Sequence, residues 1–394
     1  MSSSNLVRLT FIEEAVLGET PIVGNFQTAR FTSESLSGTP GTTESQQIRS
    51  DRMSSGQIVT SLEVGGEINF ELAKEPSLDL LIGSAMMNNW SVVAPVVDDL
   101  TIDAVAKTIT RSVGDFNADL DVGDIFTTFA FTITENNTQF QVLEIVAPTI
   151  IRVSMPAGVV TEIGAGNSFK RADRISIGTL KRSFSMEKAF LDLTNKAINY
   201  KGMLANSLSL NVAYGEIVNG SIGLMGTEYE AVNSPVDFLT NSRVVTPSGT
   251  TNSLNGSIDM PFISSSAVGI LQDVGFCIQS LGLELSNNLS AQNCIGKVEA
   301  ADYSIGTAAI SIDLSAYLAD DNWSLLQKKL TQEEFAMGFM LKNSDGWLGF
   351  YLPAIQVSFD DPSSGGANQE ISLEMSGMAK VGPNGESSLY IYRS

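Results

Sequence analysis

The chain has 394 residues and carries 23 Lys and Arg against 44 Asp and Glu, a formal net charge of −21, and it contains no histidine. The missing imidazole excludes a Ser-His-Asp or Cys-His relay, a histidine general base and histidine-ligated zinc. The scarcity of basic side chains argues against ordinary nucleic-acid binding, which depends on clustered Lys and Arg. Cys277 and Cys294 are too few for a disulfide framework and match no paired-cysteine metal spacing, so we expect free or buried thiols.

The first residues, MSSSNLVRLT, lack the basic and apolar regions of a secretion signal, so no secretion is expected. No uncharged apolar run of about 18 residues occurs, and we therefore expect neither a membrane span nor a membrane partner. The length suggests about two or three domains.

Apolar residues alternate with polar ones along much of the chain, which predicts strands that bury one face. The alternating stretches are 62–72, 208–212, 222–224, 310–318, 355–359 and 371–375. Two short helices are expected, one with Pro76 in its first turn and one behind an Asp321–Asn322 cap. The sequence therefore predicts a mainly β fold with few helices.

An internal repeat relates the two halves of the chain. Pairing Ile68 with Ile312 gives an offset of 244 residues, and pairing Leu208 with Ile355 gives 147, so the first copy holds about 97 residues that the second lacks. The matching segments are 67–86 with 309–330, 182–190 with 333–341, and 202–226 with 349–377.

The extra residues contain several short apolar stretches between turn signals, which is typical of a small β-barrel or sandwich. Insertion at a loop is the tolerated way to add such a module to a domain. The predicted organisation is a discontinuous first domain of residues 1–87 and 181–235, an inserted module of residues 88–180, and a second domain of residues 236–394.

A long polar segment follows a strand at equivalent places in both copies, at 37–60 and 286–307. Structureless stretches of this length are uncommon inside a compact domain. Their recurrence favours extended arms that become ordered on a neighbouring subunit, with a mobile surface loop as the alternative. The first predicted arm comprises Thr39, Thr43, Glu44, Gln47, Ile48, Arg49, Asp51 and Arg52, and the second Asn288, Gln292, Lys297, Glu299 and Asp302.

Adjacent acidic residues could in principle serve glycoside hydrolysis, but most fall in turns or at helix starts, where acids are favoured for capping. The segment 113–124, VGDFNADLDVGD, suggests calcium but lacks the EF-hand spacing, so we expect a surface turn. No catalytic residue, cofactor site or metal site is predicted. The acidic pairs are Glu13–Glu14, Asp98–Asp99, Asp320–Asp321, Glu333–Glu334 and Asp360–Asp361.

Four segments together resemble the tail tube (major tail) proteins of long-tailed bacteriophages, most closely the non-contractile, siphophage type. They are TARFTSESLSGTPGTTESQQIRSDR, SLEVGGEINFELAKEPSLDLLIGSAM, LKRSFSMEKAF and NYKGMLANSLSLNVAYGEIVNGSIGLMG. The resemblance covers most of residues 25–230, and the repeat extends it to about 380. It implies two tandem tail-tube β-sandwich domains, each with a short flanking helix, and it makes the inserted module similar to an optional outward decoration.

The resemblance implies a structural, non-enzymatic virion protein that works without a cofactor. Six tube domains close a ring, so two domains per chain imply a homotrimeric ring with pseudo-sixfold symmetry. The resemblance implies that stacked rings form the tail tube, and that the tape-measure protein fills this tube during assembly. Distal tail and tail terminator proteins contact its ends. Genomic DNA passes through it at ejection. Assembly in the host cytoplasm and residence in the virion tail follow. An acidic, base-poor chain suits a conduit that does not bind phosphates.

Other readings stay open at the level of sequence. A decoration or baseplate-hub protein built from similar sandwiches would form a small oligomer that never polymerises. The acidic pairs and Trp90, Trp323 and Trp347 are compatible with a carbohydrate-binding β-sandwich, although core or interface positions are expected for the tryptophans. A hexamer would replace the trimer if the two halves were not true copies.

Overall fold

The computed structural model describes residues 3–54, 56–233, 243–247, 249–257, 262–267, 277–320, 323, 326, 334–362, 366, 370–383 and 385–394. Strands dominate these residues, which confirms the predicted mainly β fold with a tube-type sandwich. The helices are short: α1 (Pro76–Ala85), α2 (Phe116–Asp119) and the 3-10 helices η1 (Ser4–Leu6) and η2 (Thr134–Asn136). The second predicted helix, opening at Asp321–Asn322, falls outside the described residues except for Trp323 and Leu326, which are helical.

The first copy of the repeat arranges its main strands in the order β1, β15, β16, β17, β5. Strand β16 is long enough to serve both layers: its first half pairs with β15 and β18, and its second half with β17. Helix α1 packs its apolar side into the core between these layers. The strands are β1 (Val7–Glu13), β2 (Gly24–Thr28), β3 (Ser33–Glu34), β4 (Ser37–Glu44), β5 (Gln57–Glu71), β15 (Ser183–Phe190), β16 (Lys196–Ala213), β17 (Asn219–Gly226), β18 (Glu228–Val232) and β19 (Arg243–Thr246). Strand β14 (Asp173–Ser176) precedes β15 in the chain but pairs outside this copy.

The second copy repeats this order as β20, β25, β26, β27, β24. Strand β21 pairs with the outer edge of β24, just as β3 pairs with β5 in the first copy. The strands are β20 (Phe262–Ala267), β21 (Ile278–Ser286), β24 (Ala309–Tyr317), β25 (Glu334–Lys342), β26 (Trp347–Phe359), β27 (Ser372–Ala379) and β28 (Tyr390–Arg393), with a separate hairpin of β22 (Ser290–Gln292) and β23 (Asp302–Ser304).

Strand register corrects the predicted alignment of the two copies. The ladder Ile68–Ile222–Leu208 corresponds to Ile312–Gly377–Val357, so Leu208 matches Val357 and not Ile355. The offset at this strand is therefore 149 residues, and the first copy holds 95 extra residues instead of 97. An alternating pattern looks the same after a slip of two residues, because each side chain returns to the same face.

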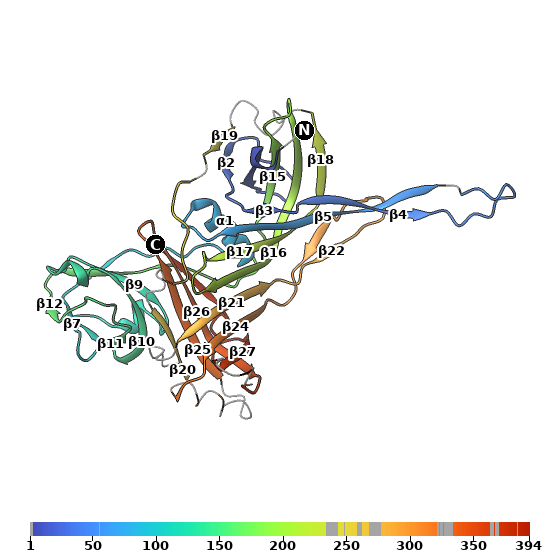
Figure 1. Cartoon of the computed structure of the whole chain (residues 1–394). Coiled ribbons are helices and arrows are strands. Elements are labelled where there is room, and N and C mark those ends of the chain that lie inside the picture. Colours follow the sequence, from blue (N-terminus) through green and yellow to red (C-terminus); the bar gives the residue numbers. More distant parts are fainter. Residues whose placement is uncertain are drawn as a thin grey trace.

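One antiparallel ladder joins the two copies into a continuous sheet. Ser207–Ala213 of β16 lies opposite Ser280–Ser286 of β21. The seven strands β5, β17, β16, β21, β24, β27 and β26 therefore follow one another without a break (Figure 1). Apolar side chains cross the whole sheet on its core side, in the row Ile68, Ile222, Leu208, Leu285, Ile310.

The residues between Val96 and Arg171 form a second sheet with a core of its own (Figure 1). Its centre contains fully buried phenylalanines, including Phe126, Phe140 and Phe169. Its strands are β6 (Val96–Asp98), β7 (Leu100–Asp103), β8 (Thr108–Arg111), β9 (Ile125–Phe129), β10 (Gln139–Ala147), β11 (Ile150–Val153), β12 (Glu162–Ile163) and β13 (Asn167–Arg171). Strand β14, also inside the expected insertion of residues 88–180, instead pairs with β28 of the large sheet.

This smaller sheet packs against the second copy, although the chain enters it from the first. Ile125 and Leu143 lie in one apolar cluster with Met340, Trp347 and Tyr351. A buried polar contact reinforces the junction: the carboxylate of Asp124 accepts hydrogen bonds from Arg174 Nη1 at 2.8 Å and from Tyr392 Oη at 2.9 Å. Burial raises the pKa of Asp124, and the charge of Arg174 opposes that rise.

A row of buried polar side chains crosses β1, β15 and β16 on the side away from the core. Thr10 lies opposite Glu187, and Glu187 lies opposite Asn199. Within the described residues, no hydrogen-bond partner faces the carboxylate oxygens of Glu187, and its ion pair with Arg8 is 3.6 Å long. Burial raises the pKa of Glu187 from 4.5 to about 7, and the charge of Arg8 opposes the rise only in part.

Glu187 makes the protein less stable as the pH rises. The folded state holds its proton more tightly than the unfolded chain, so the stabilisation is complete below about pH 4.5 and is lost as the pH rises through about 7. We expect Glu187→Gln to increase the free energy of unfolding at pH 8 by roughly 1–3 kcal/mol and to leave it nearly unchanged at pH 4. Urea denaturation at both pH values measures the difference. The exposed Glu216→Gln is the control, and an equal effect of Glu187→Gln at the two pH values would contradict the assignment.

Candidate functional site

The joined sheet has a second face, which points away from the core. Residues directly opposite one another in neighbouring strands share a face, so register identifies its members. One row runs Asn69, Ser221, Ser209, Glu284, Ser311, Met378, Gln356 from β5 to β26. The next runs Glu71, Asn219, Asn211, Gly282, Asp313, Ser376, Ser358. Most of these residues are polar, and many are serine or asparagine; Met378 is the one large apolar side chain in the two rows.

This outward face is acidic, and the described part of it that β17, β21 and the second half of β16 span with β5, β24, β27 and β26 holds no basic side chain; Lys196 and Lys201 lie in the first half of β16, beside β15 and β18. Short hydrogen bonds hold the polar groups in place: Ser221 donates to Glu67 Oε1 at 2.8 Å, and Ser315 donates to Glu374 Oε1 at 2.7 Å. No Lys or Arg intervenes in the rows, so the carboxylates are not neutralised from within the face. The acidic members are Glu63, Glu67, Glu71, Glu284, Asp313 and Glu374.

The first predicted arm is a β-hairpin that projects far from the body of the protein (Figure 1). Thr39, Thr43 and Glu44 lie on β4 and pair with β5, whereas Gln47, Ile48, Arg49, Asp51 and Arg52 lie in the connection at its tip. Arg49 and Asp51 form an ion pair of 2.6 Å with each other. Apolar side chains nevertheless face solvent here, and Ile48, Met53 and Ile58 are each more than two-thirds exposed. The hairpin is thus a structured element that presents apolar surface.

The second predicted arm lies against the first copy of the same chain. Its hairpin places Tyr303, Leu289 and Ala300 in a cluster with Met87 and Leu204. Tyr303 Oη donates a 2.6 Å hydrogen bond to the carbonyl oxygen of Gly226, and burial raises the pKa of this phenol. The arm also reaches the root of the first arm, where the Leu62 N–H donates to the carbonyl oxygen of Val298 at 2.7 Å.

The predicted residues of the second arm occupy its rim and supply only part of this contact. Asp302 forms a 2.8 Å ion pair with Lys181 of the first copy. Asn288 and Gln292 form hydrogen bonds within the arm, to Thr307 and Ser304, whereas Lys297 is exposed and Glu299 is half-buried. Tyr303 and Leu289 make the buried contact and were not among the predicted residues of this arm. The sequence signal that could have revealed them is the presence of one aromatic and one aliphatic residue in an otherwise polar segment.

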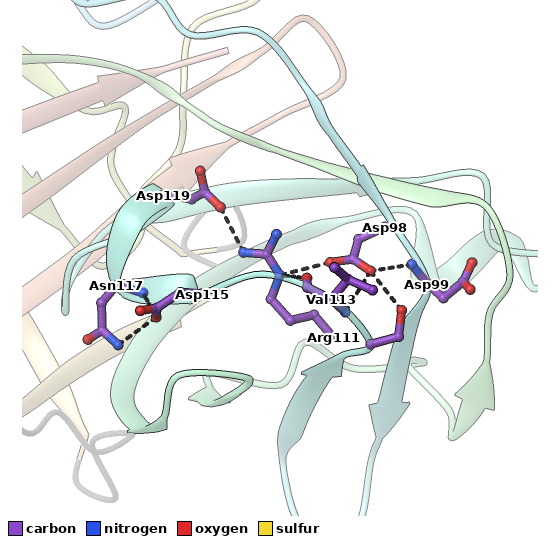
Figure 2. A network of polar contacts seen from close by, with 8 residues as sticks. Asp98, Asp99, Arg111, Val113, Asp115, Asn117 and Asp119 are labelled. Atoms are coloured by element: carbon purple, nitrogen blue, oxygen red, sulfur yellow. Dashed lines mark hydrogen bonds and ion pairs between the residues drawn. The ribbon is translucent and has the colours of Figure 1, made fainter.

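Arginine side chains neutralise the acidic groups that suggested a cation site. Arg111 donates to Asp98 at 2.8 Å and to Asp119 at 2.7 Å, and Asp115 caps α2 by accepting from the Asn117 N–H (Figure 2). Burial raises the pKa of Asp98, but the hydrogen bonds from Arg111 and Ser112 outweigh it and lower the pKa overall. In the part of the chain that the structure describes, no three Cys, Asp or Glu side chains converge as metal ligands would.

Two of the acidic pairs that the sequence offered for hydrolysis, Glu13–Glu14 and Asp98–Asp99, form ion pairs and hydrogen bonds within the fold. Glu13 forms an ion pair with Arg182 at 2.6 Å. Glu14 accepts hydrogen bonds from Ser183 and Ser185 and is buried. Trp347 is buried, Trp90 packs against the core beneath Arg393, and Trp323 is half exposed. Cys277 and Cys294 are exposed free thiols.

A comparison with protein families relates this chain to known proteins. A family model described as phage tail tube protein matches residues 4–379, which is nearly the whole chain. No curated protein matches the sequence. Across the residues that could be searched, none of the helices has the length and apolar content needed to cross a membrane.

The hydrogen bond of Tyr303 tests whether the second arm is fixed to the first copy. We expect Tyr303→Phe to cost about 1 kcal/mol of stability, because the Gly226 carbonyl loses its donor in a buried site. Tyr303→Ala removes the ring as well, and we expect about 3–5 kcal/mol. Chemical denaturation measures both values, and limited proteolysis of the arm should accelerate in the same order. The exposed Tyr214→Phe is the matched control, and equal losses for Tyr214→Phe and Tyr303→Phe would contradict the docking.

Proposed function

The chain belongs to the phage tail tube protein family, and from this premise we propose that three copies close into a pseudo-sixfold ring and that such rings stack into the tail tube. The observation that supports this proposal is the antiparallel ladder between β16 and β21, which joins two copies of the same strand order side by side. Each junction of this kind adds a tube domain to a continuous sheet. Heterologous contacts that repeat with rotation close into a ring, and closure removes exposed sheet edges.

The proposal assigns the outward face of the joined sheet to the channel. Six carboxylates and no basic side chains at its described positions make a surface that repels phosphates. DNA passing at ejection would therefore move without being held by ion pairs. Most of the other positions in the two rows are serine, asparagine or glycine, which add little bulk to the channel wall, and the exceptions are Gln356 and Met378.

The first arm is the proposed contact between stacked rings. It extends beyond the body, and its apolar side chains at Ile48, Met53 and Ile58 lack cover among the described residues (Figure 1). Exposed apolar patches mark interaction sites, and a hairpin that reaches a neighbour can bury them there. The second arm makes the corresponding contact within the chain, against the first copy.

We also propose the domain division, the tail type and the partners of this protein. The domains are 1–87 with 181–235, 88–180 and 236–394, with the small sheet as an outward decoration. The tail is of the non-contractile, siphophage type. The partners are the tape-measure protein, the distal tail protein and the tail terminator, and assembly takes place in the host cytoplasm. None of these roles is enzymatic.

Electron microscopy of the purified protein tests the assembly. We expect stacked rings whose averaged end views have threefold symmetry and six similar inner lobes. Discrete small oligomers that never stack, at protein concentrations at which tail tubes polymerise, would overturn the proposal and favour a decoration or hub component. A stable monomer under those conditions would also overturn it.

The charge of the channel face has a direct test. We expect Glu67→Lys, Glu284→Lys and Glu374→Lys together to give assembled tubes that bind short duplex DNA at least about tenfold more tightly, with a steep salt dependence. Glu19→Lys, Glu135→Lys and Glu216→Lys form the matched control, because these exposed sites change the net charge equally from −21 to −15. Fluorescence anisotropy at several salt concentrations measures the affinity, and equal binding by the two variants would contradict the channel assignment.

Shortening the first arm should separate ring formation from stacking. Thr42 lies opposite Val59, so replacing residues 43–58 with Asn-Gly closes a shorter hairpin in register. We expect a folded protein with an unchanged circular dichroism spectrum that forms rings but few tubes. Sedimentation and microscopy distinguish the two. Tubes of normal length and yield would exclude the arm from ring-to-ring contact.

A further inference from the structure

Met378 interrupts the polar outward face of the joined sheet. Its side chain is 63% exposed and lies outside the hydrophobic core. In its row it lies between Ser311 of β24 and Gln356 of β26. Methionine is flexible and polarisable, and it is frequent on surfaces that bind apolar side chains of a partner.

A hollow of about 380 Å³ adjoins Met378 on this face. Serine side chains form much of its wall, and Ser311, Ser358 and Ser376 line it together with Gln356 and Met378. None of the residues that line the hollow is charged. The hollow therefore offers an apolar contact at Met378 within a neutral rim.

The first copy lacks this apolar contact at the equivalent place. The strand ladders that relate the copies put an acid, a glycine and a serine at the positions of Ser311, Met378 and Gln356, namely Glu67, Gly223 and Ser207. A Cβ atom at Gly223 would meet the Oγ atom of Ser207, so a methionine does not fit there unless that side chain moves. The methionine is thus a property of the second copy, and a ring of three chains would present it three times.

Acidic side chains surround the hollow on the same face. Glu284 lies opposite Ser311, and Asp313 lies opposite Ser376. Glu374 is two residues from Ser376 on β27 and is exposed. Opposite residues on neighbouring strands are about 5 Å apart, so long basic side chains beside a group held in the hollow reach these carboxylates.

We propose that the hollow binds an apolar side chain of an elongated helical protein in the channel, and that Lys or Arg residues next to it contact the surrounding carboxylates. The face of a paired sheet offers side chains and no free backbone groups, so it suits a helix, whose backbone groups are paired internally. Residues three or four apart share one side of a helix, which places basic residues beside the apolar one. Nucleic acid does not match, because the carboxylates repel phosphates.

This inference rests on the proposed function, which places the outward face in the channel. It adds the chemistry of the protein that the channel would hold: a basic amphipathic helix with an apolar residue seated at Met378.

Peptide binding to the unassembled chain tests the hollow. The probe is a fluorescein-labelled helical peptide of leucine and lysine, and a matched peptide of equal charge has serine in place of leucine. We expect Met378→Ser to weaken binding of the leucine peptide by about fivefold or more, because apolar contact is lost, and to leave the weaker binding of the serine peptide unchanged. Met378→Leu should retain the affinity. Val105→Ser, which removes an exposed valine of the smaller sheet, is the control.

Fluorescence anisotropy measures these affinities. Equal affinity of the native chain and Met378→Ser for the leucine peptide would overturn the inference. Glu284→Gln with Asp313→Asn should weaken binding of both peptides, because both lose ion pairs, and unchanged binding would overturn the part assigned to the carboxylates.

A second measurement separates this inference from the proposed function. In a Cys277→Ser and Cys294→Ser background, Met378→Cys is treated before and after assembly with a maleimide that carries a bulky polymer. We expect modification of the unassembled chain and little modification in tubes, because the polymer does not enter the channel. Equal modification in both states would overturn the proposed function and with it the placement of this partner in the channel. Protection in tubes without an effect of Met378→Ser on peptide binding would overturn this inference and leave the proposed function intact.

Discussion

The pairing of β16 with β21 is the interaction on which the rest of the structure depends. It uses backbone hydrogen bonds, so it joins the two copies without requiring that their side chains be alike. It also fixes the relative rotation of the copies, because every residue from Ser207 to Ala213 has one partner. The core row and the outward acidic rows continue across it only because the register is kept. A slip of one residue would bring Glu284 into the core and Leu285 onto the outward face.

Side chains alternate between the two faces of each strand, so one face can form the core while the other serves the proposed function. Residues on one parity, such as Ile68, Leu208 and Ile312, build the hydrophobic core. Residues on the other parity, such as Glu67, Ser209 and Asp313, lie outside that core. In the proposed tube, the same sheet would therefore contribute to the core through one face and repel phosphate with the other. Six of the acidic residues that contribute to the net charge of −21 lie together on this face.

Strand alternation, α1 and the repeat were predictable from the sequence, because each depends on local pattern. The alignment at Leu208 was wrong by two residues, since alternation is unchanged by such a slip and only hydrogen bonding between strands decides it. The face of each strand could not be assigned for the same reason. The docking of Tyr303 depends on residues more than 75 positions away, Gly226 among them, and no local pattern encodes that contact. The polar segment at 37–60 was predicted to be structureless, but it forms the hairpin of β4 and β5, because backbone pairing does not depend on apolar side chains; its role as a ring-stacking arm stays a prediction.

The smaller sheet has a mechanical consequence for the molecule. It is joined covalently to the first copy through the chain after α1, yet it packs on β25, β26 and β28 of the second, where Asp124 contacts Tyr392. The smaller sheet therefore connects the two copies at a second place, away from the β16–β21 ladder. A sheet joined along one line can bend about that line, whereas one also braced at a second point resists bending. The smaller sheet supplies stiffness to the two-copy unit, and the ladder supplies its cohesion.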